Sequence, residues 1–310
     1  MGLNMALRGW LKPGDHCIVS SMEHNAVMRP LHDLVDQGVS FDRIPCDREG
    51  RLDPAGLPPL IRPNTRLVAM AHASNVGGAI QDAAAVGKLC RERGIPLLLD
   101  AAQTAGHWDI DFEGWGLAAL SVPGHKGLMG PSGIGALLLS PEFARGLTPI
   151  VSGGTGSASD SERQPDYMPD RLESGTPNLP GIYGLHAAVE FILETGVEAL
   201  RRREEALTEQ FLAGLRDIPG IRLAGPWTLE NRAGVISVDF LEQDNAEAAF
   251  RLEQQYGILT RCGLHCAPAA HRTLGTFPQG TVRFSPGWYT TPEEVAAAVA
   301  AVGEIAGGAG

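Results

Sequence analysis

The fold is decided by Leu97-Leu98-Leu99-Asp100-Ala101-Ala102-Gln103, in which a short apolar run ends in a carboxylate. Such a run, bounded by turn signals, is typical of a strand that is buried on both faces. In open α/β sheets, ligands bind outside the carboxyl ends of the strands. We therefore expect Asp100 to lie at a binding site, although an isolated aspartate there could also be a helix N-cap.

Short apolar runs alternate with helix-like stretches on both sides of Asp100. The predicted strands are 16–20, 66–71, 96–100, 117–122 and 134–140, with helices after Glu23 and over 82–93. This alternation is typical of a mostly parallel sheet covered by helices. The sequence therefore predicts an α/β fold.

A long helical pattern from about Ile182 to Leu215, with a break at Gly196, leads out of this region. After Pro219 the pattern changes to strands at 234–240 and 281–284 and helices at 246–256 and 293–305. We expect a large domain at 1–205 and a smaller C-terminal α+β domain at 206–310.

Composition limits the partners. The 310 residues are 44% hydrophobic and carry a formal net charge of −11, which argues against nucleic acid or an anionic membrane. No apolar stretch approaches the roughly eighteen residues of a membrane span, and no signal-peptide pattern opens the chain. We expect a cytoplasmic protein that acts on small molecules.

The cysteines predict reduced thiols. They number five, an odd count spread over a long chain, which fits free thiols better than a disulfide framework. Cys262 and Cys266 lack a second cysteine pair or carboxylate cluster nearby, so we expect no metal site.

A lysine in a glycine-dense turn follows Asp100 by about twenty-five residues, in Pro123-Gly124-His125-Lys126-Gly127-Leu128-Met129-Gly130-Pro131-Ser132-Gly133-Ile134-Gly135. Glycines let backbone N–H groups approach an anion, and the lysine can serve as a phosphate ligand or as an amine nucleophile. The turn is not a Walker loop, because Gly-Lys-Ser/Thr is absent. A lysine that forms a Schiff base and an aspartate that pairs with a pyridinium nitrogen are what pyridoxal 5'-phosphate requires. Lys126 and Asp100 fit these two roles.

With these residues in place, the chain resembles the class V aminotransferases, and within them the cysteine desulfurases. The resemblance implies pyridoxal phosphate as cofactor, a transferase fold of type I and a homodimer with shared sites. It rests on separated motifs in the same order: Asp100-Ala101-Ala102-Gln103, Gly124-His125-Lys126-Gly127, Glu23-His24-Asn25-Ala26, Ser74-Asn75-Val76-Gly77-Gly78, Glu173-Ser174-Gly175-Thr176-Pro177-Asn178 and Gly263-Leu264-His265-Cys266-Ala267-Pro268.

The resemblance also implies roles for single residues. His24 would stack on the cofactor ring, Gln103 would contact its phenolic oxygen, and Asn75 would lie by that oxygen and the substrate carboxylate. His125 would reach the phosphate, and Thr176 would reach the phosphate of the partner subunit. Taken singly, His24 could instead be a first-turn helix residue, Asn75 a turn former and Gln103 a surface amide.

The sulfur chemistry is assigned to Cys266 in the same way. The matching cysteine of the desulfurases attacks the sulfur of L-cysteine, and Arg283 matches the arginine that binds the substrate carboxylate. We expect Cys266 to be exposed on a mobile loop, with His265 as a candidate to lower its pKa. The persulfide would then pass to a sulfur-acceptor protein.

Two departures from the family pattern affect the phosphate. Pro123 stands where relatives tend to have Ser or Thr, and it offers neither a hydroxyl nor an N–H. The N-terminal segment with the phosphate-binding loop is also expected to be missing. Alternatives to a cysteine desulfurase are a selenocysteine lyase or another class V enzyme, and a truncated, catalytically silent subunit or scaffold.

Overall fold

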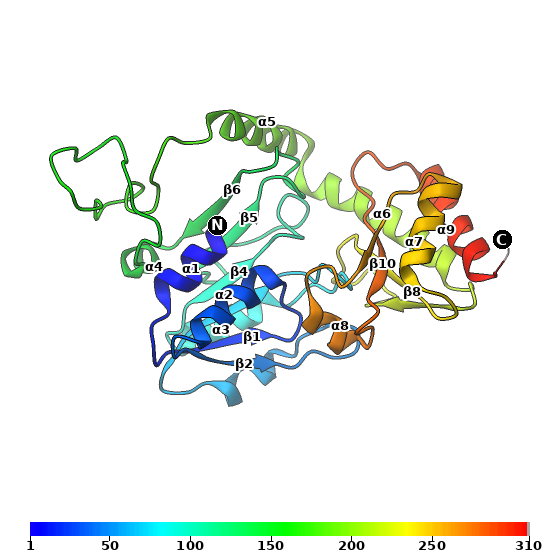
Figure 1. The fold of residues 1–310 in the computed structure, drawn as a ribbon, viewed down its shortest axis with the longest axis horizontal. Helices are drawn as coiled ribbons and strands as arrows, with labels where there is room; N and C mark the ends of the chain where they lie inside the picture. The colour runs from blue at the N-terminus through cyan, green and yellow to red at the C-terminus, as the bar shows by residue number, and fades with distance from the viewer. Residues whose placement is uncertain (309–310) are drawn as a thin grey trace.

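The computed structural model describes residues 1–308, which form two sheets with helices around them (Figure 1). The first sheet has the strand order β2-β1-β3-β4-β5-β6, parallel except for β6, which runs antiparallel to β5. Its strands are β1 His16–Ser20, β2 Ser40–Ile44, β3 Thr65–Ala71, β4 Leu97–Asp100, β5 Ala119–Pro123 and β6 Gly135–Leu139. The predicted mostly parallel α/β architecture is confirmed.

Helices cover both faces of this sheet because its central strands are apolar on both sides. Cys17 and Val19 of β1 pack with helices α1 and α2, whereas Ile18 packs with α3. Successive side chains of a strand point to opposite faces, so one short run supplies two cores. The helices before the second domain are α1 Gly2–Trp10, α2 Asn25–Val35, α3 Ala83–Glu92, α4 Pro141–Gly146, α5 Leu179–Thr195 and α6 Val197–Leu215, with short 3₁₀ turns η1 Pro54–Gly56 and η2 Pro58–Leu60.

The long helical pattern is two helices. Gly196 adopts φ 89°, a left-handed conformation that favours glycine, and it separates α5 from α6 as predicted. The apolar side of α6 from Leu207 to Leu215 belongs to a separate hydrophobic core, which lies against the second sheet.

The second sheet is antiparallel, with the order β7-β8-β10-β9. Its elements are β7 Ile221–Ala224, β8 Ile236–Phe240, α7 Asn245–Tyr256, β9 Arg261–Gly263, α8 Pro268–Leu274, β10 Thr281–Phe284 and α9 Pro292–Ala306. Sequence patterns identified β8, β10, α7 and α9 but not the short β7, β9 and α8, or the partly polar edge strand β2. The division at 205/206 stays a prediction; the core that begins at Leu207 supports it.

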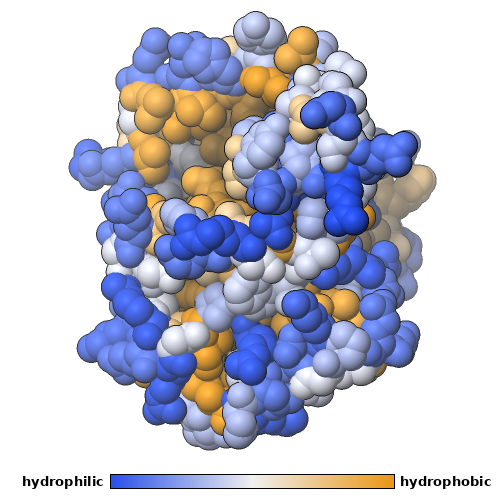
Figure 2. Space-filling model, turned by 90° about the vertical axis from the view of Figure 1, so that its left-hand side faces the viewer, coloured by the Kyte–Doolittle hydropathy of each residue, from blue (hydrophilic) through white to orange (hydrophobic). Residues whose placement is uncertain are grey.

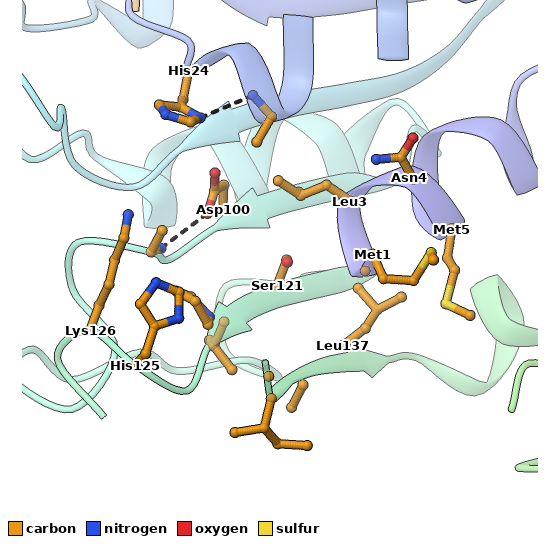
Figure 3. A pocket seen from close by; sticks show the side chains of 18 of the residues that line it. Met1, Leu3, Asn4, Met5, His24, Asp100, Ser121, His125, Lys126 and Leu137 are labelled. Carbon is orange, nitrogen blue, oxygen red and sulfur yellow. Dashed lines mark hydrogen bonds between the residues drawn. The ribbon is translucent and has the colours of Figure 1, made fainter. Parts of the chain in front are cut away.

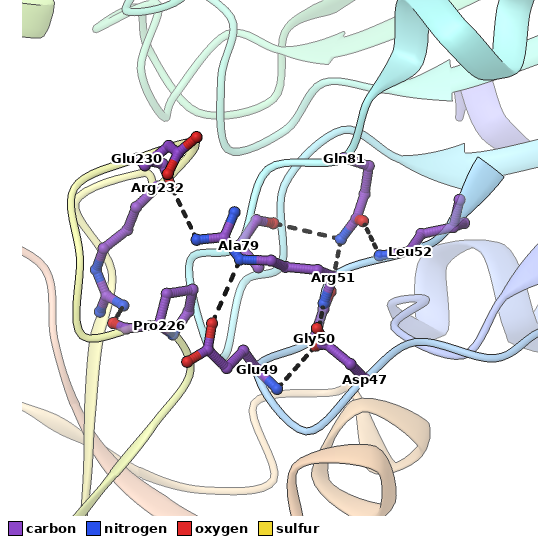
Figure 4. Close-up of polar contacts among 10 residues, drawn as sticks. All are labelled: Asp47, Glu49, Gly50, Arg51, Leu52, Ala79, Gln81, Pro226, Glu230 and Arg232. Atoms are coloured by element: carbon purple, nitrogen blue, oxygen red, sulfur yellow. Dashed lines mark hydrogen bonds and ion pairs between the residues drawn. The ribbon is translucent and has the colours of Figure 1, made fainter.

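The two parts of the chain are joined by main-chain hydrogen bonds beside a buried arginine, which holds its own segment in shape (Figure 4). Arg232 is 1% exposed, and its guanidinium donates to the carbonyls of Pro226 and Val235. The next residue, Ala233, donates its N–H to Gly78 O at 2.9 Å. The segment 226–235 is thereby fixed against the loop 73–81, which follows β3 of the first sheet.

Candidate active site

A cavity of about 950 Å³ opens where β3, β4 and β5 end at their carboxyl ends (Figure 3). Six of the side chains singled out in the sequence line it: His24, Asn75, Asp100, Gln103, His125 and Lys126. They come from separate segments, and parallel strands bring them to one edge of the sheet. Among residues 1–308 no cluster of three or more His, Cys, Asp or Glu could hold a metal ion.

Asp100 forms a buried carboxylate at the end of β4. It is 6% exposed, and its Oδ1 accepts the Ala102 N–H at 3.0 Å. Burial raises the pKa of Asp100, and the Ala102 N–H and Lys126 oppose that shift. The cap-like bond that the sequence allowed is therefore present, and it leaves the carboxylate on the cavity wall.

Lys126 lies beside this carboxylate because two turns touch through their backbones. A Cβ on Gly106, in the turn after Asp100, would lie 2.4 Å from Gly127 O, and a Cβ on Gly127 would lie 2.4 Å from Ala105 O. Burial lowers the pKa of Lys126. The negative charge of Asp100 opposes this shift, and the positive charge of Arg283 adds to it. A lowered lysine pKa makes the neutral, nucleophilic amine more available.

His24 is the N-cap of α2 and also faces the cavity. Its Nδ1 accepts the Ala26 N–H at 3.0 Å, so the neutral ring carries its proton on Nε2. Partial burial lowers the pKa of His24 to about 4, and the charges of Lys126 and Arg283 contribute. The imidazole ring is therefore neutral at pH 7. A neutral imidazole suits stacking on a ring that becomes a cation, such as a pyridinium.

Asn75 joins the cavity to Arg283 of β10. Its main-chain carbonyl accepts from Arg283 Nη1 at 3.0 Å, and its side chain donates to His265 O at 2.7 Å. Arg283 lines a second cavity, of about 800 Å³, which also contains Lys126 and Gln103. Lys126 thus faces the space beside Asp100 and the space beside Arg283.

Cys266 is exposed in the turn between β9 and α8. A thiolate there lies close enough to raise the pKa of both Lys126 and Arg283, so it is near the cavity although it is not part of its lining. The prediction that His265 lowers the pKa of the Cys266 thiol is wrong. Its ring is buried against Thr281 Oγ1 at 3.0 Å, and burial lowers its pKa to about 3, so it carries no positive charge at pH 7.

Thr176 lies apart from the other predicted site residues. It is exposed in the segment between α4 and α5, and it is absent from the lining of the cavity around Lys126. Met168, Leu172 and Glu173 of the same segment do reach that lining. The structure therefore does not bring Thr176 to the site of its own chain.

Sequence reasoning missed Ser121 and the first turn of α1. Both line the far end of the cavity, and a Cβ on Gly2 would lie 3.3 Å from Ser121 Oγ (Figure 3). The first-turn N–H groups of α1 have no side-chain cap. Ser121 could have been found from strand alternation, because it precedes Pro123 by two residues and points to the same face.

Comparisons with known proteins agree with this geometry. Residues 1–297 match the family model for class-V aminotransferases. A probable cysteine desulfurase of Methanothermobacter thermautotrophicus is 32% identical over 300 residues, which cover 96% of this chain and 74% of that protein. A cysteine desulfurase of Pectobacterium carotovorum is 33% identical and covers 96% and 72%.

Solved structures agree as well. The apo cysteine desulfurase of Thermococcus onnurineus superposes with a TM-score of 0.91 at 32% identity, covering 99% of this chain and 77% of that one. The cysteine desulfurase CsdA of Escherichia coli gives a TM-score of 0.88 at 30% identity, covering 98% and 76%.

The fold and the lysine–aspartate cavity define an enzyme of the transferase type that the sequence resembled. The chain belongs to the class V aminotransferase family. Both the resemblance and the fold class inferred from the sequence are confirmed.

Proposed function

We propose that this chain is a pyridoxal-phosphate-dependent cysteine desulfurase that converts L-cysteine to L-alanine and holds the sulfur as a persulfide on Cys266. The observation that carries the proposal is that Lys126 and the buried Asp100 line one cavity, with the exposed Cys266 nearby. The names of the relatives at 32–33% identity support the sulfur chemistry.

The residues of the cavity fit the cofactor. Lys126 would hold it covalently, Asp100 would face the ring nitrogen, and His24 would lie on the ring. Gln103 and Asn75 would lie by the phenolic oxygen, and His125, Ser121 and the first turn of α1 would receive the phosphate. When bound, pyridoxal phosphate supplies a ring that accepts electrons from the substrate Cα.

The protein moves protons through Lys126. Its pKa is lowered by the cavity walls, so a larger fraction of the amine is unprotonated near neutral pH and can take the Cα proton. Asp100 keeps its position through the Ala102 N–H bond, and its negative charge favours a protonated ring nitrogen.

Arg283 orients the substrate. Its guanidinium is half-buried, Nη1 is fixed on Asn75 O, and Nε is buried without a hydrogen-bond partner among the described residues. A planar guanidinium binds a carboxylate in two-point fashion, so the substrate carboxylate fits this position. Loss of Arg283 would raise the KM for L-cysteine.

Cys266 takes the sulfur. Its thiolate attacks the substrate sulfur, the new S–S bond forms as the C–S bond breaks, and the electron pair of that bond stays with the substrate carbon. Protonation of this carbon gives alanine, and the persulfide passes to a sulfur-acceptor protein. The acceptor, like the cytoplasmic location, stays a prediction from the sequence; no helix within residues 1–308 has the length and apolar character to cross a membrane.

We also propose a homodimer, in which Thr176 serves the phosphate of the partner subunit. The face shown in Figure 2 has a hollow with hydrophobic side chains around it. Large apolar side chains are exposed on β6, on α5 and in the segment between α4 and α5, among them Leu138, Tyr167, Met168, Leu179, Ile182 and Tyr183. Exposed apolar groups on this scale are typical of a surface that a partner covers.

The small number of lysines lets a test of cofactor binding identify the attachment site. The chain has three, Lys12, Lys88 and Lys126, and of these only Lys126 lines the cavity. The protein should gain the absorption band of lysine-bound cofactor when pyridoxal phosphate is added, and borohydride reduction should fix the label on Lys126. Lys126→Ala should lose the band, whereas Lys88→Ala should keep it.

A silent scaffold would give no band, or a label spread over the three lysines, and this result would reject the proposal. If the band forms, sulfide and selenide release from L-cysteine and L-selenocysteine should be compared. A higher kcat/KM for L-cysteine is expected, and release from L-selenocysteine alone would favour a selenocysteine lyase.

A further inference from the structure

The turn that carries Cys266 has a backbone that needs external support. His265 and Cys266 adopt φ 48° and 57°, so two consecutive residues with side chains lie in the left-handed region. This conformation crowds Cβ against the following carbonyl and persists only where the surroundings fix it.

Two hydrogen bonds from the large domain hold the carbonyls of these two residues. Asn75 Nδ2 donates to His265 O at 2.7 Å, and the main-chain N–H of Asn25 donates to Cys266 O at 2.7 Å. Asn25 directly follows His24, and Asn75 itself lines the cavity around Lys126. The donors therefore belong to the same segments as the site.

The small domain holds the turn from the other side. His265 is 7% exposed, and its ring is hydrogen-bonded to Thr281 of β10. Its centroid lies 5.4 Å from that of His271 on α8, which is bonded to Thr276 Oγ1 at 2.7 Å. The turn is thus fixed on both domains, which differs from the mobile loop expected from the sequence.

Asn75 is itself held firmly. Its carbonyl accepts from Arg283, and the end of its loop is fixed by Gln81, whose side chain bonds Leu52 N at 2.7 Å and Gly50 O at 2.8 Å (Figure 4). A donor on a rigid loop can fix the position of its acceptor.

We propose that Asn75 is a positioning residue for the Cys266 thiol, acting together with the main-chain N–H of Asn25. The role rests on the proposed desulfurase function. It uses one N–H of the Asn75 amide, which donates to His265 O, and leaves the second N–H for the contact with the cofactor. The turn keeps this fixed position while Cys266 takes the sulfur from the substrate and while it transfers the sulfur to the acceptor. The acceptor must therefore approach Cys266.

Asn25 offers a matched pair of variants. Asn25 is the first residue of α2, where proline is well accepted, and His24 has φ −76° and ψ 154°, which a following proline tolerates. Asn25→Pro removes the N–H that bonds Cys266 O, whereas Asn25→Ala keeps it. Asn75→Asp keeps the side-chain size and removes the donor to His265 O.

Hydrogen exchange of the amides 264–267 is measured in the protein without cofactor, together with sulfide release in the protein with it. Asn25→Pro and Asn75→Asp should exchange about tenfold faster than wild type, with Asn25→Ala unchanged. Asn25→Pro should lower kcat for sulfide release while KM and the absorption band of the lysine-bound cofactor stay the same.

Equal exchange in Asn25→Pro, Asn75→Asp and Asn25→Ala would overturn the inference, as would faster exchange with an unchanged kcat in Asn25→Pro. No sulfide release from the wild-type protein would reject the proposed function instead. The exchange rates report the turn in either case, so the two failures are distinguishable.

Discussion

Two segments carry predicted functional residues, and they are built differently. The turn at Cys266 is bonded to Asn25, Asn75 and Thr281, all distant in sequence. The segment that carries Thr176 has several bonds within itself, such as Gln164 Nε2 to Ser174 Oγ at 3.1 Å. A residue that acts within its own chain needs contacts of that chain to fix its position, as Cys266 has. Thr176 is exposed instead, which is expected of a residue that acts in the site of a partner subunit.

The largest expected effect tests the first segment. Cys266→Ser should lower sulfide release from L-cysteine by more than about a thousandfold, because the nucleophile is lost, while the absorption band of the lysine-bound cofactor remains. Cys262→Ser, in the adjoining strand β9, is the control and should keep most of the activity. Retained sulfide release in Cys266→Ser would contradict the proposed role.

The second segment is tested by Thr176→Ala, which should weaken cofactor binding by about tenfold through loss of one hydrogen bond to a charged group. Mixed dimers of Thr176→Ala and Lys126→Ala protomers should recover one site of normal affinity. That site combines the lysine of one protomer with the threonine of the other. No recovery in the mixed dimer would mean that Thr176 does not serve its partner.

A pH titration should separate the two segments further. Burial lowers the pKa of His265 to about 3 and that of His271 to about 4, from an ordinary value of 6.5. Above pH 6.5 the two histidines are neutral in the folded and in the unfolded chain, so their burial costs no stability. Below it the unfolded chain binds protons that the folded chain does not, so stability is lost as the pH falls from 6.5 towards 4.

Hydrogen exchange at pH 7 and pH 5 would measure this effect. After correction for the intrinsic rate, the amides around Cys266 should exchange faster at pH 5 than at pH 7. The reason is that opening of the turn lets each histidine take up as much as about one proton. The segment 147–178 contains no histidine and serves as the internal reference. An equal response in both segments would contradict the assignment.

The smallest effect concerns the left-handed backbone at Cys266. Cys266→Gly and Cys266→Ala both remove the thiol, but only glycine relieves the crowding at φ 57°. The free energy of unfolding of Cys266→Gly should therefore exceed that of Cys266→Ala by about 1 kcal/mol. Denaturant unfolding of the two variants measures this difference, and equal midpoints would show that the turn is not strained.

Much of the site could be predicted because its residues follow strand ends and turns. Asp100 and Lys126 were found from an apolar run and a glycine-dense turn, and parallel strands bring them together. The His265 ring points inward, and the hydrogen bond from Asn75 to the His265 carbonyl joins residues 190 positions apart. Local patterns carry no information about such pairs, so the rigid Cys266 turn could not be predicted.

The backbone contact between Gly106 and Gly127 has a consequence for the diversification of this site. The spacing between Lys126 and Asp100 is set by main-chain atoms, so substitutions in the cavity walls leave it unchanged. New substrates can therefore be accommodated by changing residues such as Phe191 and Trp288 of the second cavity. A side chain at either glycine would separate the amine from the carboxylate, whatever the substrate.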